Sequence, residues 1–351
     1  MIQPSFFDLP NRLEDLSSCG DPLERLSDTV DFEMFRSLLE KTLGLKKGGR
    51  PPYDAVLMFK ILILQALYTL SDDQMKYQIK DRLSFMRFLG LDLSQSVPDA
   101  KTIWLYRERL TEKGMIHQLF KRFDEALRDQ GYLAMGGQIV DATIIQAPRQ
   151  RMKKDEKEQI KAGEIPQEWK EKPQKLRQKD RDARWMVKYS KARSDKEVNL
   201  GIPLFGYKNH ISIDKRFGFI RGQEVTDASV YDGHILANIL NKDNTASGVW
   251  GDTAYRNERN EAWMEKNGFR SQIHRKKPKG KLMPRHIQKG NGVKSKTRSK
   301  VEHVFATQKV GMAMFIRTIG IKRARVKIEI GNLVYNMKRL VFWESRKALA
   351  G

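Results

Sequence analysis

The chain has 351 residues, and 66 Lys and Arg against 43 Asp and Glu give it a net charge of +23 at pH 7. This length accommodates two domains, and the positive excess favours a polyanionic partner, either nucleic acid or an acidic membrane surface. A membrane span is disfavoured because the longest apolar run, residues 55–70, is short and contains Lys60 and Gln65. The single cysteine, Cys19, excludes an intramolecular disulfide and a cysteine-based zinc site.

The first 30 residues are expected to form an irregular arm, because Pro4, Pro10, Gly20 and Pro22 interrupt any regular pattern. The start of the sequence has neither the basic segment nor the long apolar core of a secretory signal. We therefore expect a cytoplasmic protein.

Residues 31–133 are expected to form an all-helical domain. Ser71 and Asp99 are the expected N-caps of two of its helices, and the second of these carries Lys101 and Arg109 on one face. A short helix, a turn and a capped basic helix fit a helix-turn-helix that reads DNA. A helical bundle with a solvated basic face fits the same residues equally well.

Beyond residue 136 the pattern changes to short apolar runs that predict strands, with helices between and after them. The expected strands are 138–145, 207–214, 217–226, 248–253 and 269–274, and the expected helices begin near 232 and cover 299–311 and 328–346. This order predicts a mixed α/β layer structure over 136–346.

A charged segment at about 149–198 interrupts this order. Residues 149–193 hold 16 basic and 8 acidic side chains. We interpret the segment as an inserted, partly helical or mobile arm, while a solvated linker is the ordinary interpretation of such a charge run. Trp169, Trp185 and Tyr189 argue against disorder and would stack either on bases or on the body of the protein.

Three acidic residues carry the strongest chemical signal. Asp141 and Asp252 each stand at the end of a short apolar run that predicts a buried strand, and Glu302 lies in an expected helix. Two strand-end carboxylates and one helical carboxylate form a set of ligands for a pair of hard divalent cations. Such a pair stabilises the attacking and leaving oxygens of a phosphoryl transfer.

A strongly basic stretch precedes Glu302. Residues 266–298 include twelve Lys and Arg, and no Asp or Glu occurs from 266 to 301. Lys276, Lys277 and Lys279 of this stretch are therefore expected to hold DNA phosphates, with Glu302 holding metal. The alternative is a basic loop followed by an ordinary surface glutamate.

Helical spacing groups Arg298 and Lys309 with Glu302. At 100° per residue the three positions fall within about 40° of one face, so the two cations would reach a phosphate beside the metal. Taken alone, this spacing arises often by chance in charged helices.

In chain order, the motifs V-D-A-T at 140–143, G-Y-K-x-H at 206–210, G-D-x-A-Y at 251–255 and R-x3-E-x6-K at 298–309 resemble the DDE transposases of bacterial insertion sequences. The nearest likeness is to the insertion-sequence-five group of the four/five superfamily. The resemblance covers almost the whole chain and includes Arg87-Phe88-Leu89-Gly90-Leu91 in the helical region.

The resemblance implies a ribonuclease-H-like catalytic domain with flanking helices, preceded by the all-α domain. Asp141, Asp252 and Glu302 would be the catalytic metal ligands for two Mg²⁺ ions per site, with Mn²⁺ as an expected substitute. The enzyme would hydrolyse the phosphodiester at the transposon end and join the freed 3′-OH to target DNA.

The implied partners are the terminal inverted repeats and target DNA, with a homodimer in the active complex and no membrane or small-molecule substrate. The expected location is the bacterial cytoplasm, in association with the nucleoid. The resemblance also places Lys208 and His210 near the site, although a structural role is the more ordinary interpretation of an isolated strand Lys or His. Ser295 departs from the family pattern, which has a tyrosine there, and this removes the expected tyrosine contact with DNA.

Two other functions fit the same residues. The first is a catalytically silent DNA-binding regulator on the same fold, which the presence of all three acids disfavours. The second is a structure-selective nuclease that cuts DNA but never joins it. A phosphate-binding loop of the GxxxxGK[ST] type is absent, so a P-loop ATPase or helicase is not supported.

Overall fold

The computed structural model describes residues 7–43, 51–189, 200–278 and 280–349. The chain divides into two compact units, which we call the helical unit and the sheet unit. The helical unit comprises Met1–Tyr132, Val310–Ala313 and Glu329–Gly351, and the sheet unit comprises Leu133–Lys309 and Met314–Ile328. The boundary between the units lies near residue 133, and residues 329–346 group with the helical unit and not with the sheet.

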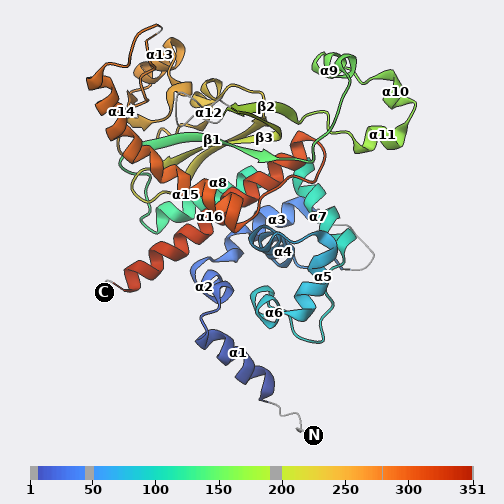
Figure 1. The fold of residues 1–351 in the computed structure, drawn as a ribbon. Helices are drawn as coiled ribbons and strands as arrows, with labels where there is room; N and C mark the ends of the chain where they lie inside the picture. The colour runs from blue at the N-terminus through green and yellow to red at the C-terminus, as the bar shows by residue number, and fades with distance from the viewer. Residues whose placement is uncertain (1–6, 44–50, 190–199, 279, 350–351) are drawn as a thin grey trace. The chain divides into compact units, whose positions relative to one another are not determined.

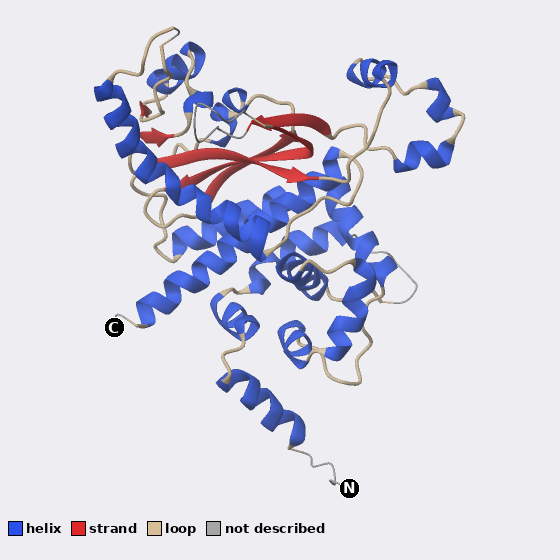
Figure 2. Cartoon of the chain, viewed as in Figure 1, coloured by secondary structure: helices blue, strands red, loops and turns tan. Residues whose placement is uncertain are grey.

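The described part of the helical unit contains only helices and turns (Figures 1 and 2). Its helices are α1 (Asp8–Ser18), α2 (Pro22–Thr29), α3 (Arg36–Leu43), α4 (Ala55–Tyr68), α5 (Asp72–Asp81), α6 (Leu83–Leu89), α7 (Ala100–Glu112), α8 (Met115–Asp129) and the C-terminal part of α16 (Ile321–Ala348). The expected irregular arm over residues 1–30 is wrong for α1 and α2. Pro22 starts α2, and the Asp21 side chain accepts a hydrogen bond from the Leu23 N–H at 2.9 Å, so these residues mark a helix start.

Helix α4 supplies much of the core of this unit. The ring of Phe59 packs edge-on against Phe35 with 5.1 Å between centroids, and Phe35 stacks on Phe123 of α8. Burial in this core explains the apolar run at 55–70. Among the described helices none is by itself long and apolar enough to cross a membrane, although α4 and α5, bent by 98° at the break between them, meet that criterion as a pair.

The predicted helix starts at Ser71 and Asp99 are confirmed. Ser71 and Gln74 form a reciprocal capping box at the start of α5, and Asp99 accepts a hydrogen bond from the Thr102 N–H at 2.7 Å at the start of α7. Arg107 of α7 forms an ion pair with Asp72, the first residue of α5. That arginine therefore links two helices of the bundle.

The sheet unit contains one six-stranded mixed sheet (Figure 2). Its strands are β1 (Gln138–Gln146), β2 (Arg184–Tyr189), β3 (Gly201–Asp214), β4 (Ile220–Asp227), β5 (Gly248–Trp250) and β6 (Arg270–Ser271). The order is β2-β3-β1-β5-β6, with β4 also paired to β3. Strands β1, β3 and β4 are antiparallel, whereas β5 runs parallel to β1 and β6 parallel to β5. This is a ribonuclease-H-like fold, as the sequence predicted.

The charged segment at 149–198 is partly helical, as expected, but its last described part belongs to the sheet. It forms α9 (Lys154–Lys161), α10 (Gln167–Lys170), α11 (Pro173–Gln178) and then β2, which pairs antiparallel with residues 201–206 of β3. The start of β3 extends beyond its pairing with β1, and β2 satisfies backbone groups that would otherwise lie on an open edge. An arm outside the sheet is therefore the wrong description for residues 184–189.

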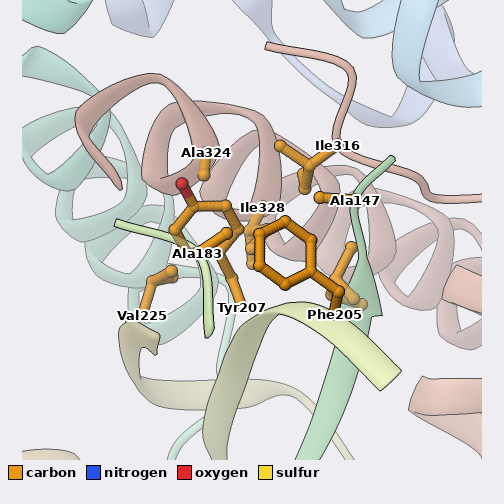
Figure 3. Packing of buried hydrophobic residues seen from close by; sticks show 9 residues of the cluster. Ala147, Ala183, Phe205, Tyr207, Val225, Ile316, Ala324 and Ile328 are labelled. Atoms are coloured by element: carbon orange, nitrogen blue, oxygen red, sulfur yellow. The ribbon is translucent and has the colours of Figure 1, made fainter. Parts of the chain in front are cut away.

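Apolar side chains hold the sheet to the start of α16 (Figure 3). Phe205 and Tyr207 of β3 pack with Ala324 and Ile328 of α16. The Tyr207 hydroxyl donates a hydrogen bond to the buried Asp180 at 2.7 Å, which fixes the end of the inserted segment to the sheet. A second apolar cluster packs α12 (Leu236–Ile239) and α13 (Glu258–Lys266) beside β1 and β5.

We expect Trp169→Ala to unfold the three inserted helices while the sheet stays folded. The Trp169 indole is fully buried, and its Nε1 donates a hydrogen bond to Glu156 at 2.7 Å. Loss of such a side chain costs about 3–5 kcal/mol, which is large for three short helices. Limited proteolysis should then cut the variant between 150 and 180. Trp169→Phe retains most of the packing and should resist cleavage, so equal cutting of both variants would contradict this account.

Candidate active site

The three candidate acids come from three separate elements of the sheet unit. Asp141 lies in the middle of β1 rather than at its end, which corrects the sequence-based expectation. Asp252 follows β5 by two residues and caps the turn Thr253–Tyr255, and Glu302 is the first residue of α15 (Glu302–Ala306).

The parallel pairing of β1 with β5 brings the two aspartates together. Gln138 pairs with Val249 and Ile139 with Trp250. The same offset continued by two residues places Asp252 beside Asp141. Asp252 is further fixed because its Oδ1 accepts a hydrogen bond from the Ala254 N–H at 2.8 Å.

Arg298 joins the third acid to this pair. Its Nη1 donates a hydrogen bond to Asp141 Oδ2 at 2.6 Å, and its Nη2 lies 3.3 Å from Glu302 Oε1. Arg298 is the last residue of α14 (Arg285–Arg298), one turn before Glu302. The guanidinium therefore holds a positive charge between two of the three carboxylates, a role that sequence reasoning had not given it.

The helix that carries Glu302 is irregular. Helix α14 begins at Arg285, earlier than predicted, and it passes into a tight turn at Ser299–Val301, then α15 and then a wider π-type turn at Thr307–Gly311. Uniform rotation of 100° per residue therefore does not extend from Arg298 to Lys309. Arg298 and Glu302 are neighbours, as predicted, and Lys309 lies within electrostatic range of Glu302 and Asp141 although the helix between them is irregular.

Burial dominates the electrostatics of Asp141. It raises the pKa of this carboxyl to about 7, while Arg298 and the Ala142 N–H act in the opposite direction and the charges of Asp252 and Glu302 raise the pKa further. Asp252 and Glu302 thus both lie within electrostatic range of Asp141. Ionisation of Asp141 costs free energy that a closely bound cation offsets.

The chemistry of the acids fits a divalent metal that prefers oxygen ligands. Asp141 on β1, Asp252 after β5 and Glu302 on α15 supply carboxylate oxygens, and such ligands suit Mg²⁺ or Mn²⁺. In the described chain no three acidic, histidine or cysteine side chains are already close enough to hold an ion. Arg298 bridges Asp141 and Glu302, so its guanidinium supplies the positive charge beside these two carboxylates.

Lys208 and His210 of β3 are engaged inside the protein. Lys208 Nζ donates hydrogen bonds to the Val230 carbonyl at 2.6 Å and to Asp232 at 2.8 Å. His210 Nε2 lies 2.9 Å from the Thr226 hydroxyl, and burial lowers the pKa of His210 to about 4, so its ring is neutral. These contacts favour the structural role over direct phosphate binding.

The other predicted DNA-binding residues lie outside the acid cluster. Lys276 and Lys277 are exposed in the segment that follows β6. Lys279, predicted with them, lies outside the described residues.

Ser295, at the position of the family tyrosine, is 3.3 Å from the His274 ring. Burial lowers the pKa of His274. The charge of Arg298 lowers it further, and the charge of Asp252 raises it. Sequence reasoning missed His274 because no spacing rule connects it to the acids.

Comparison with known families agrees with this geometry. Residues 132–337 match the family of the Transposase DDE domain, and residues 11–109 match the Transposase domain (DUF772). The chain belongs to the DDE transposases. No solved structure matches it significantly. Its assignment to the insertion-sequence-five group stays a prediction, whereas membership of the wider transposase family is shown.

The pH dependence of stability tests the buried state of Asp141. Without metal, the melting temperature should fall as the pH rises from the usual aspartate range to about 7, because the unfolded chain ionises this carboxyl first. The slope from this group is on the order of 1 kcal/mol per pH unit. Asp141→Asn should lack this component, and Glu265→Gln, an exposed acid on α13, should keep it. Identical profiles for Asp141→Asn and wild type would contradict the burial effect.

Proposed function

We propose that this transposase binds the terminal inverted repeats of an insertion sequence, hydrolyses the phosphodiester at each end and joins the freed 3′-OH to target DNA. The observation that carries the proposal is that Asp252 and Glu302 both lie within electrostatic range of Asp141, and the parallel strand pairing and the Arg298 bridge support it. The family membership of the chain supports the same reaction class.

Asp141, Asp252 and Glu302 would hold the divalent metal, with Mg²⁺ as the expected ion, two per site, and Mn²⁺ as its substitute. Bound metal supplies Lewis-acid activation of water and stabilisation of the leaving oxygen. The hydrogen bond from Ala254 orients Asp252, and the rigid position of β1 orients Asp141. Once Arg298 leaves Asp141, its guanidinium is suited to a bidentate contact with a DNA phosphate beside the cut.

The basic surfaces supply the rest of the DNA contact in this proposal. Lys276 and Lys277 are exposed in a stretch free of acidic residues. The helical unit, through α7, would recognise the inverted repeats, and two ends brought together imply a homodimer in the active complex. A bundle without base contacts remains the alternative for α7, since Arg107 serves the packing of that unit.

A catalytically silent DNA-binding regulator is the second candidate function. One observation favours the regulator: Arg298 neutralises Asp141 in the structure. A structure-selective nuclease would share the site but would ignore the ends of the element. A transposition assay separates all three.

In that assay the donor carries a marker flanked by the DNA that borders this gene. We expect insertions with the wild-type chain and none with Asp252→Asn, because one metal ligand is removed while DNA binding is unaffected. Glu265→Gln, the matched exposed acid, should support insertion as the wild type does. Binding of end DNA without insertion by the wild type would support the regulator, and cutting without joining would support the nuclease.

The contribution of the basic segment can be measured through salt dependence. Lys276→Ala with Lys277→Ala should weaken binding of end DNA and reduce the slope of log K against log salt by about 0.9 for each phosphate that the variant no longer neutralises. Lys242→Ala, an exposed lysine before β5, serves as the control. An unchanged slope in the double variant would show that this segment does not bind DNA.

A further inference from the structure

A cavity of about 330 Å³ opens in the sheet unit near Asp141 and Glu302. One wall begins at Ala142, the residue that follows Asp141 on β1. Another wall contains Lys309, which lies seven residues beyond Glu302. Two of the lining residues are therefore close in the chain to Asp141 and Glu302, although none of the three acids lines the cavity.

The inserted strand β2 supplies a wall of this cavity. Met186 and Lys188 line it, whereas Val187 between them does not and is 45% exposed. This alternation is that of a strand with one face on the cavity. Met186 pairs with Leu204 of β3, which also lines the cavity. The segment inserted into the sheet thus contributes directly to the surroundings of the catalytic acids.

Three lysines and one aspartate line the cavity, so its lining carries a net positive charge. Lys208 is paired with Asp232, the cavity's one acidic lining residue. Lys188 and Lys309 form no ion pair within the described residues. Burial and then the Lys188 ammonium lower the pKa of Lys309, while Glu302 and Asp141 raise it. Lys309 therefore lies within electrostatic range of Lys188 and of the two acids. Two ammonium groups that repel each other are suited to a shared phosphate.

The remaining lining is suited to a planar, mainly apolar group. Met186, Leu204, Met314 and Phe315 supply thioether, aliphatic and aromatic surfaces. Thioethers and aromatic rings pack favourably against flat rings of bases. The hydroxyl of Thr143 and the amide of Gln146 add polar groups on the β1 side. The volume lies near the lower limit of the roughly 300–1,000 Å³ of ligand pockets, which is too small for a length of duplex.

We propose that this cavity receives one unpaired nucleotide of the transposon-end strand next to the reacting phosphodiester, with its phosphate between Lys188 and Lys309 and its base against Met186, Leu204 and Phe315. The inference rests on the proposed function, since it names a binding site for that substrate. It assigns the inserted strand a positioning role, because Lys188 and Met186 act on the nucleotide and not on the reacting atoms.

Binding of end DNA with single abasic sites tests the base contact. In the full-length chain, removal of the base at one position beside the reacting phosphodiester should weaken binding by about tenfold. Met186→Trp, which fills the cavity, should bind intact DNA about tenfold more weakly and should be insensitive to that abasic site. Val187→Trp adds the same bulk outside the cavity and should behave as wild type.

Salt dependence tests the phosphate contact independently. Lys188→Ala should reduce the salt slope by about 0.7, the value for a contact with a single strand, while Lys242→Ala should not. Lys188 is exposed, so this variant should fold normally even if Met186→Trp does not.

The outcomes separate the two proposals. If the wild type cuts and joins but Met186→Trp keeps the full abasic effect, or Lys188→Ala keeps the full slope, the nucleotide site is wrong and the proposed function stands. Competition by inorganic phosphate that depends on Lys188, without any abasic effect, would reduce the cavity to an anion site and overturn the inference. If the wild type neither cuts nor joins end DNA, the proposed function fails and this inference fails with it.

Discussion

The parallel pairing of β1 with β5 is the constraint on which the candidate site depends. Asp141 and Asp252 are 111 positions apart in the chain, and the register of two short strands places them side by side. Strand β1 also pairs with β3, so the position of Asp141 is fixed from both edges. A shift of this register by one residue would turn one carboxylate to the other face of the sheet and separate the acids.

The second feature is the charge balance around Asp141. A buried carboxylate next to two other acids is unfavourable without a cation, and Arg298 supplies that charge. The guanidinium neutralises this site in the structure, and in the proposed function a divalent metal would do so instead. Exchange between them would couple metal binding to release of Arg298 toward a DNA phosphate, and this ties the ion pair to the proposed reaction.

The inserted segment is a third feature, and it is built into the sheet rather than attached to it. Trp169 and Glu156 stabilise its helices, Asp180 binds Tyr207, and β2 completes the edge of β3. These contacts place Lys188 on the cavity near Asp141 and Glu302. The additional length of β3 has backbone groups that require a hydrogen-bonding partner, and the inserted strand β2 supplies it.

The sequence by itself determined the order of the predicted strands, the three acids, the two helix caps and the basic stretch, because apolar periodicity and local capping chemistry are properties of neighbouring residues. It failed for α1 and α2, for β2 and for the irregular turns on either side of α15. The engagement of Lys208 by Asp232 and of Asp141 by Arg298 could not be read from spacing either. Those contacts join residues from 24 to 157 positions apart. Only the tertiary structure decided them, because strand register, burial and irregular helical turns determine which charges meet.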